Sequence, residues 1–284
     1  MKCGKWPPPP RKKKISLAVA SSLLSTEPTR ELRAVKASLV ARAAGIFRAD
    51  EIIVYRDKGS RRRDQEELFS LLSYLATPPY LRRRIIPLKP ELRIAGLLLP
   101  LNIPTHDLPP KPREGLVMYG VVEECDDHVC RVYLGRYGAG ILRVKRRVPH
   151  GSLIMVRIVS LDPMILEETR EPDFYAGFRV IRGSSLKEIA SSYRAKGYAI
   201  IGTSRKGDCL SRSGLDNLSR GKKGVLIAVG GPRGSVVRDA GGYDYFDAVV
   251  NLAPFQGTRT IRSEEAVLIA LSRLTPLIEA TETL

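Results

Sequence analysis

The chain has few of the residues that build metal centres, disulfide scaffolds or membrane spans. Its 284 residues include four cysteines and three histidines, and no histidine has zinc-motif spacing. So few cysteines in a chain of this length exclude a fold held together by disulfides. No apolar run is long enough to cross a bilayer. We therefore predict a cytoplasmic protein without a metal and without a membrane partner.

Two of the cysteines, Cys125 and Cys130, flank residues 126–128, which are typical of a hairpin tip. A metal site there would need more ligands nearby. A cross-strand disulfide is one possibility for the pair. We expect structural free thiols instead.

Acidic residues are also scarce relative to basic ones, 30 against 47, which gives a net charge of +17. The positive charge is clustered, and such a charge distribution favours a polyanionic partner such as RNA. Aromatic residues make up 6% of the chain. We therefore expect contacts to the phosphate backbone to dominate nucleic-acid binding over base stacking.

Short apolar runs alternate with helical patterns in the first and last parts of the chain. Ile15–Ala20 and Glu51–Tyr55 are typical of strands, and a helix after Pro28 would carry its apolar side chains at helical spacing. This alternation predicts an α/β fold with a parallel sheet. The apolar positions expected on the first helix are Leu32, Val35, Leu39 and Ala43.

The middle of the chain has a different pattern. Prolines are frequent from Pro87 to Pro112, and short β-like runs separated by turns follow over residues 115–160. Several short strands in such a segment are typical of a small barrel such as an OB-fold. We predict a basic, proline-rich arm over 1–14, an inserted barrel domain over 91–164, and an α/β domain from 15–90 and 165–284.

Three glycine-containing segments follow apolar runs in the last third of the chain, at residues 202–207, 230–234 and 251–260. In a parallel sheet such segments lie at the carboxyl ends of strands, where open sheets bind ligands. Glycine there allows a close approach of the backbone to a ligand. None of the segments has the spacing of a P-loop or of a GxGxxG fingerprint. Three such segments at one edge predict one composite pocket.

These segments resemble the cofactor region of the SPOUT methyltransferases, in particular an archaeal and eukaryotic branch of RNA methyltransferases with an inserted OB-like barrel. The resemblance is carried by GTSRKG, GGPRG and NLAPFQGTRTIRSEEAVLIALSRL, and an N-terminal match adds SSLLSTEPTRELRAVKASLVARAAGIFRADEIIVYRD. It implies a knotted SPOUT-type parallel sheet with an inserted small β-barrel. A trefoil knot would hold S-adenosylmethionine, and the protein would be a homodimer.

The resemblance also implies an S-adenosylmethionine-dependent RNA methyltransferase, with N3 of a uridine in large-subunit rRNA as the expected acceptor. Two alternatives stay open. The first is a ribose 2′-O-methyltransferase that acts on rRNA or tRNA. The second is a ribosome-assembly factor that binds RNA without catalysis.

Three sets of site residues follow from the segments, the clustered charge and the resemblance. The catalytic candidates are Arg259, Glu264 and Arg205, although the position of Glu264 at a helix start also explains an acidic residue there. The cofactor-binding candidates are Gly202, Thr203, Ser204, Gly207, Gly230, Gly231, Gly234, Asn251, Leu252, Ala253, Pro254, Gly257, Thr258 and Ile261. The RNA-binding candidates are Arg61, Arg62, Arg63, Arg143, Lys145, Arg146, Arg147 and Arg233.

Overall fold

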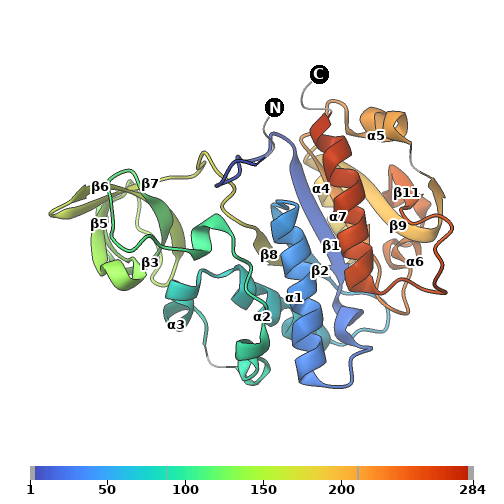
Figure 1. Ribbon diagram of the computed structural model, residues 1–284, viewed down its shortest axis with the longest axis horizontal. Coiled ribbons are helices and arrows are strands. Elements are labelled where there is room, and N and C mark those ends of the chain that lie inside the picture. Colours follow the sequence, from blue (N-terminus) through green and yellow to red (C-terminus); the bar gives the residue numbers. More distant parts are fainter. Residues whose placement is uncertain (1–3, 88, 210, 281–284) are drawn as a thin grey trace. The chain divides into compact units, whose positions relative to one another are not determined.

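The computed structural model describes residues 4–87, 89–209 and 211–280, and the chain forms two compact units (Figure 1). One unit is built on a sheet and contains residues 11–76, 90–101 and the chain from 177 onward. The other is built on a barrel and contains residues up to 10, 77–89 and 102–176.

The sheet unit has six strands in the order β11-β9-β10-β1-β2-β8, and every neighbouring pair is parallel. The central strands are buried along almost their whole length and are mostly apolar, as expected for a parallel sheet that is covered on both faces. All seven side chains of β1 except the first are buried, as are all of β10. The strands are β1 (Lys14–Ala20), β2 (Glu51–Tyr55), β8 (Arg179–Arg182), β9 (Tyr198–Cys209), β10 (Gly224–Val229) and β11 (Ala248–Asn251).

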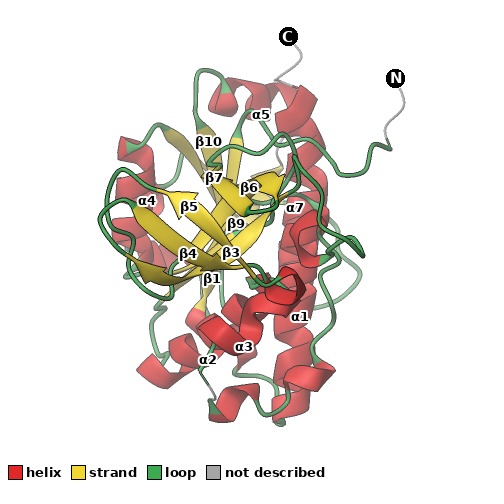
Figure 2. Ribbon diagram, turned by 90° about the vertical axis from the view of Figure 1, so that its left-hand side faces the viewer, coloured by secondary structure: helices red, strands yellow, loops and turns green. Residues whose placement is uncertain are grey.

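Helices lie on both faces of this sheet (Figure 2). The helices α4 (Leu186–Ala195) and α6 (Val236–Ala240) share one core with alternate residues of the strands. On the other face α1 (Arg30–Ile46) packs against both α2 (Arg62–Ala76) and α7 (Ser263–Ala280), and α5 (Arg212–Ser219) packs against α7. The sheet unit is therefore a three-layer α/β/α structure.

Helix α1 forms where it was expected, but a different face of it is buried. Thr29 caps it by accepting a hydrogen bond from the Leu32 amide at 3.3 Å. The apolar stripe expected to be buried is largely exposed, with Leu32 at 47% and Leu39 at 43%. The buried face consists mainly of alanines, whose short side chains let the helix lie close to its neighbours. They are Ala34, Ala37, Ala41, Ala43 and Ala44.

The second unit contains a closed five-stranded barrel with the order β3-β4-β5-β7-β6. Its pairs are antiparallel except for β5 and β7, which run parallel. This small Greek-key barrel confirms the predicted OB-like module. Its strands are β3 (Val117–Cys125), β4 (Val129–Tyr133), β5 (Ala139–Arg143), β6 (Leu153–Leu161) and β7 (Met164–Glu168), and a short helix α3 (Arg82–Ile85) belongs to the same unit.

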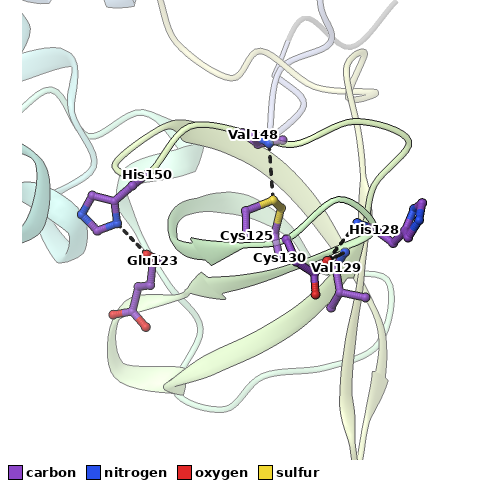
Figure 3. The surroundings of a disulfide bond; sticks show 8 residues. Glu123, Cys125, His128, Val129, Cys130, Val148 and His150 are labelled. Carbon is purple, nitrogen blue, oxygen red and sulfur yellow. Dashed lines mark hydrogen bonds between the residues drawn. A yellow bond between two sulfur atoms is a disulfide. The ribbon is translucent and has the colours of Figure 1, made fainter.

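Cys125 and Cys130 form a disulfide across the β3–β4 hairpin, so the expectation of free thiols is wrong (Figure 3). The two residues are directly paired in the register of the hairpin, with their Cα atoms 4.0 Å apart. Asp126 stabilises the tip by accepting hydrogen bonds from the amides of His128 and Val129 at 2.8 and 2.6 Å. The Val148 amide also donates to Cys125 Sγ at 3.3 Å.

The units of the structure differ from the predicted domain boundaries at three places. Residues 164–168 close the barrel as β7, which a boundary after 164 would remove. Residues 77–89 belong to the barrel unit, because the Tyr80 hydroxyl donates to the Tyr119 carbonyl at 3.1 Å and accepts from its amide at 3.2 Å. Residues 91–101 belong to the sheet unit, where the Leu99 amide donates to Ser38 Oγ at 3.1 Å.

The predicted N-terminal arm over residues 1–14 is also divided between the two units. Its described residues up to Pro10 belong to the barrel unit, and Arg11 belongs to the sheet unit. Arg11 is buried, donates to the Phe47 carbonyl at 2.6 Å and forms an ion pair with Glu279 at 2.9 Å. The segment is therefore held by specific contacts of Arg11 with the sheet unit.

Candidate active site

A cavity of about 430 Å³ lies at the carboxyl ends of β9, β10 and β11. The three glycine-containing segments supply most of its wall, and the first two turns of α7 supply the rest. The strand ends meet here because all three strands run parallel, which is the usual place for a ligand in an open sheet.

The first wall comes from an interruption in the pairing of β9 with β11. Val249 of β11 pairs with Gly202, whereas the next residue, Val250, pairs with Asp208. Residues 203–207 consequently bulge out of the ladder, and Thr203, Ser204, Arg205 and Lys206 face the cavity. The start of the bulge is anchored to the neighbouring strand β10, because Thr203 Oγ1 donates to the Ala228 carbonyl at 3.0 Å.

The second wall is the turn after β10. Here the Gly234 amide donates to the Gly231 carbonyl at 3.1 Å, which closes a tight turn. A Cβ added to Gly231 would lie 2.1 Å from Ser22 Oγ, so the turn lies directly against the residues that follow β1. Asp57 fixes those residues by accepting hydrogen bonds from Ser21 Oγ and the Ser22 amide, each at 3.0 Å.

The third wall is the segment between β11 and α7, which is tied to the first wall. Asn251 Nδ2 donates to the Arg205 carbonyl at 3.0 Å, and Arg205 Nη1 donates to the Arg259 carbonyl at 2.8 Å. Asn251 Oδ1 also accepts from the Ala253 amide at 3.0 Å. The first and second of these bonds join residues that are 46 and 54 positions apart in sequence, and they hold the two loops around one space.

A buried ion network anchors the end of this segment at the start of α7. Lys36 Nζ lies 3.0 Å from a carboxylate oxygen of Glu27 and 3.2 Å from one of Glu264, and all three side chains are at least 92% buried. Arg262 pairs with both carboxylates as well. Burial alone would raise the pKa of Glu27, but the hydrogen bond from Lys36 and the nearby cations lower it below its usual value.

Most predicted site residues line the cavity, and several do not. Glu264, one of the catalytic candidates, lies outside the wall, and its carboxylate forms ion pairs with Lys36 and Arg262. At the start of α7 the Ser263 hydroxyl donates to the Gly230 carbonyl at 3.2 Å, which joins the helix to the second wall. Lining residues from the predicted sets are Thr203, Ser204, Arg205, Gly230, Gly231, Gly234, Asn251, Leu252, Ala253, Arg259 and Ile261. Residues that do not line it are Gly202, Gly207, Pro254, Gly257 and Thr258.

Two of the excluded glycines have a packing role. A Cβ on Gly202 would lie 3.0 Å from the ring of Phe246, and one on Gly207 would lie 2.6 Å from the Val250 backbone. Gly257 has open space around it and no positive φ, so nothing in the backbone requires glycine there.

Sequence reasoning missed a polar group that supports the second wall. Tyr55 donates a hydrogen bond to Asp239 at 3.3 Å. Burial raises the pKa of Asp239, and the negative charge of the nearby Asp57 raises it further. Tyr55 is the last residue of β2 and Asp57 follows that strand, next to the carboxyl end of β1. Their position at the same sheet edge as the glycine segments was the available signal.

The predicted RNA-binding residues are all exposed. Arg61, Arg62 and Arg63 lie at the start of α2, and Arg233 lies on the turn after β10. Arg143, Lys145, Arg146 and Arg147 extend from the end of β5 on the barrel.

No helix among the described residues is long and apolar enough to cross a membrane. No three His, Cys, Asp or Glu side chains in this part of the chain are grouped so that they could hold a metal ion.

Residues 14–274 match a family described as "Putative RNA methyltransferase". The chain belongs to this family. The match includes all three walls of the cavity, the network at Lys36 and the whole barrel, so the family predicted from the sequence is confirmed.

Curated relatives match over most of the chain. A Drosophila melanogaster protein named 28S rRNA (uridine-N(3))-methyltransferase is 31% identical over 93% of this chain and 62% of its own length. A human protein of the same name is 30% identical over 94% of this chain and 79% of its own. An uncharacterized protein of Halobacterium salinarum is 31% identical over 92% of this chain and 98% of its own. The chain thus spans less than two thirds of the Drosophila relative.

We predict that Lys36→Met destabilises the protein by about 3–5 kcal/mol, because it removes the buried one of the two cations that Glu27 and Glu264 share and leaves only the half-exposed Arg262. Urea unfolding at neutral pH measures this loss. The matched control is Glu67→Gln, which removes the more exposed ion pair with Arg33 and leaves the hydrogen bond from Arg33 to the Glu27 carbonyl in place. That control should cost about 1 kcal/mol or less. Equal losses in the two variants would contradict a structural role for the network.

A second prediction separates two glycines of the cavity region. Gly207→Ala should cost about 1–3 kcal/mol in thermal or urea unfolding, because the new methyl group would meet the β11 backbone at 2.6–2.8 Å. Gly257→Ala should leave stability unchanged, since nothing lies within 4 Å. A stable Gly207→Ala variant would show that β9 and β11 separate without cost at this point.

Proposed function

We propose that the protein is an S-adenosylmethionine-dependent RNA methyltransferase that modifies N3 of a uridine in large-subunit rRNA. The observation that carries the proposal is the single cavity built by three segments at the carboxyl edge of the sheet, in a chain of an RNA methyltransferase family. The acceptor atom follows the printed name of the insect and human relatives.

The lining of the cavity fits this cofactor chemically. Leu252, Ile261 and Ile269 provide an apolar wall suited to an adenine ring, and the backbone of the three segments provides donors and acceptors for its edge. Ser204, Asn251 and Gln256 add polar groups for a ribose and an amino acid. S-adenosylmethionine would supply the methyl group, as the electrophilic carbon on its sulfonium.

The uridine side of the reaction needs N3 to lose its proton, which would pass to solvent, before or as the new N–C bond forms. The electron pair of the broken C–S bond then stays on sulfur. No carboxylate or imidazole is among the described residues that line the cavity. Arg205, Lys206 and Arg259 do line it, and their positive charge would stabilise the deprotonated base. We therefore assign these three residues to acceptor activation and Glu264 to structure.

RNA would bind over the exposed basic residues of both units. Two basic clusters are exposed to solvent, namely residues 143–147 on the barrel and the arginines at the start of α2. They carry the positive charge that attracts a phosphate backbone. These contacts position the RNA, while the cavity selects the nucleotide that reacts.

A homodimer also belongs to the proposal. The sheet unit exposes large apolar side chains that a monomer leaves in water, and α1 and α7, which carry most of them, pack together. They include Leu32, Val35, Leu39, Phe255 and Leu268. Leu271 on the same helix is fully buried, so Leu268 is the residue to test. The trefoil knot and the cytoplasmic location stay predictions.

We predict that the purified protein converts uridine to 3-methyluridine when given large-subunit rRNA and S-adenosylmethionine. Digestion to nucleosides and mass spectrometry distinguish this product from 2′-O-methyluridine. Arg259→Ala should lower kcat at least about tenfold, because it removes a cation from the cavity. Arg273→Ala, an exposed arginine on α7 outside the cavity, is the control and should be neutral.

Two results would contradict this proposal. Ribose methylation would replace the acceptor atom and leave the cofactor assignment intact. A folded protein that transfers no methyl group to any rRNA would favour an assembly factor without catalysis.

The dimer prediction is that wild-type protein scatters light as twice 31.4 kDa and that Leu268→Glu converts it to a monomer. The control is Val159→Glu, which changes an exposed apolar residue of the barrel unit and should leave the mass unchanged. A monomeric wild type with full activity would refute the interface.

A further inference from the structure

The barrel unit contains a second cavity of about 340 Å³. Its wall comes from the N-terminal segment, the segment before β3, the start of β3, β6 and the segment after β7. The lining residues include Trp6, Asp107, Arg113, Arg157, Asp173 and Phe174. None of the residues that line it lines the first cavity. A cavity of this size is large enough for a small ligand.

Two aromatic side chains face this cavity. Trp6 is the only tryptophan of the chain, and 66% of its surface is exposed. Tryptophan side chains are highly buried on average, and an indole ring this exposed at a cavity wall is accessible to a ligand. Phe174 lines the same space from a distant part of the sequence. Aromatic rings placed in this way are the usual stacking partners of the bases of single-stranded nucleic acid.

Charged side chains of both signs surround the rings. Arg113 and Arg157 bring guanidinium groups, and Asp107 and Asp173 bring carboxylates. Val156 is buried in the barrel core, so its neighbour Arg157 points out of the barrel towards the cavity. Among the described residues, the side chains of Arg113, Asp107 and Asp173 form no hydrogen bond or ion pair that would occupy them.

The frame of the cavity is held rigidly. The Tyr175 amide donates to the Pro8 carbonyl at 2.8 Å, and Thr105 Oγ1 donates to the Ala176 carbonyl at 3.0 Å. Arg136 donates to the Pro109 carbonyl at 2.7 Å. Prolines fix the backbone in the N-terminal segment and in the segment before β3. A cavity shaped before binding loses little entropy when a ligand enters.

We propose that this cavity binds one nucleotide of single-stranded RNA whose base carries an exocyclic amino group. The base would stack on Trp6 and Phe174, and the arginines would hold its phosphate. The aspartates would accept hydrogen bonds from an amino group of cytosine, adenine or guanine. Uracil has no amino group, and its one donor on that edge, N3–H, is flanked by two carbonyl oxygens that the carboxylates would repel.

This inference rests on the proposed function, because it takes RNA as the partner, and it deepens that function. The nucleotide held here would differ from the uridine that is methylated. The cavity would thus contribute to the choice of the RNA segment, while the first cavity contributes the chemistry.

The single tryptophan makes the inference directly measurable. Fluorescence of the full-length protein is titrated with the trinucleotides CCC, AAA and UUU and with inorganic phosphate. We expect saturable quenching by CCC and AAA at concentrations at least tenfold below any effect of UUU. Phosphate alone should not quench, because quenching requires stacking on the indole ring. Absence of quenching by every trinucleotide, or equal quenching by phosphate, would overturn the inference.

Four variants assign the interactions. Phe174→Ala and the pair Arg113→Ala with Arg157→Ala should each weaken quenching by CCC at least tenfold. Asp107→Ala with Asp173→Ala should remove the preference for CCC over UUU, although it makes the surface more positive. The control carries alanine at Arg143, Lys145, Arg146 and Arg147 and should keep the preference. Unchanged quenching in all cavity variants would overturn the inference.

The methylation assay separates this inference from the proposed function. Trp6→Ala should raise the KM for rRNA and leave kcat and S-adenosylmethionine affinity unchanged. Base-selective quenching without any methyl transfer would sink the proposed function and leave the nucleotide site standing. Methyl transfer with an unchanged KM in Trp6→Ala would sink the site and leave the function standing.

Discussion

The pairing of β9 with β11 changes register within a single step of β11, and the architecture of the first cavity depends on this step. Gly202 and Asp208 are partners of consecutive residues, Val249 and Val250, so the intervening part of β9 leaves the ladder. Gly207 is where this bulge returns to the sheet, with no room for a side chain. The bulge brings Arg205 next to the 251–260 segment, and the two are then joined by hydrogen bonds.

The charged residues near the two ends of the 251–260 segment have different environments. At its cavity side, Arg205 and Arg259 remain exposed, where they are available to an anionic substrate. At its helix side, Arg262 and Glu264 are tied into the network around the buried Lys36. A buried pair of this kind adds little net stability, but it is costly to break. Its effect is to fix the segment in one arrangement, so that a ligand meets preformed walls.

The sequence was sufficient for the class of fold, the barrel and the location of the cavity. Parallel strands bring their carboxyl ends together whatever the details of packing, so glycine segments after apolar runs identified the correct edge. The individual residues were harder to predict. Glu264 and Gly257 both lie in the stretch 251–274 that carries the family resemblance. Glu264 is nevertheless buried in ion pairs, and Gly257 faces open space. Proximity in sequence to a wall does not determine which side chains face the cavity.

Some features left no readable signal in the sequence. The buried face of α1 is made of alanines, and the expected stripe of Leu32, Val35 and Leu39 faces outward. Helical periodicity locates an apolar face but does not say whether the core or a second subunit covers it. The path of the chain near Tyr80 depends on one hydroxyl bonded to the Tyr119 backbone, a contact between residues 39 positions apart. Domain boundaries predicted from composition cannot take such long-range contacts into account.

The central claim is that the edge formed by β9, β10 and β11 binds S-adenosylmethionine. A crystal structure of the protein grown with S-adenosylmethionine tests it most directly. The account predicts density for the cofactor between the bulge at 203–206, the turn at 230–234 and the segment 251–261, with adenine against Leu252 and Ile261. Cofactor density elsewhere on the chain, or an empty edge in a folded protein at saturating cofactor, would contradict it.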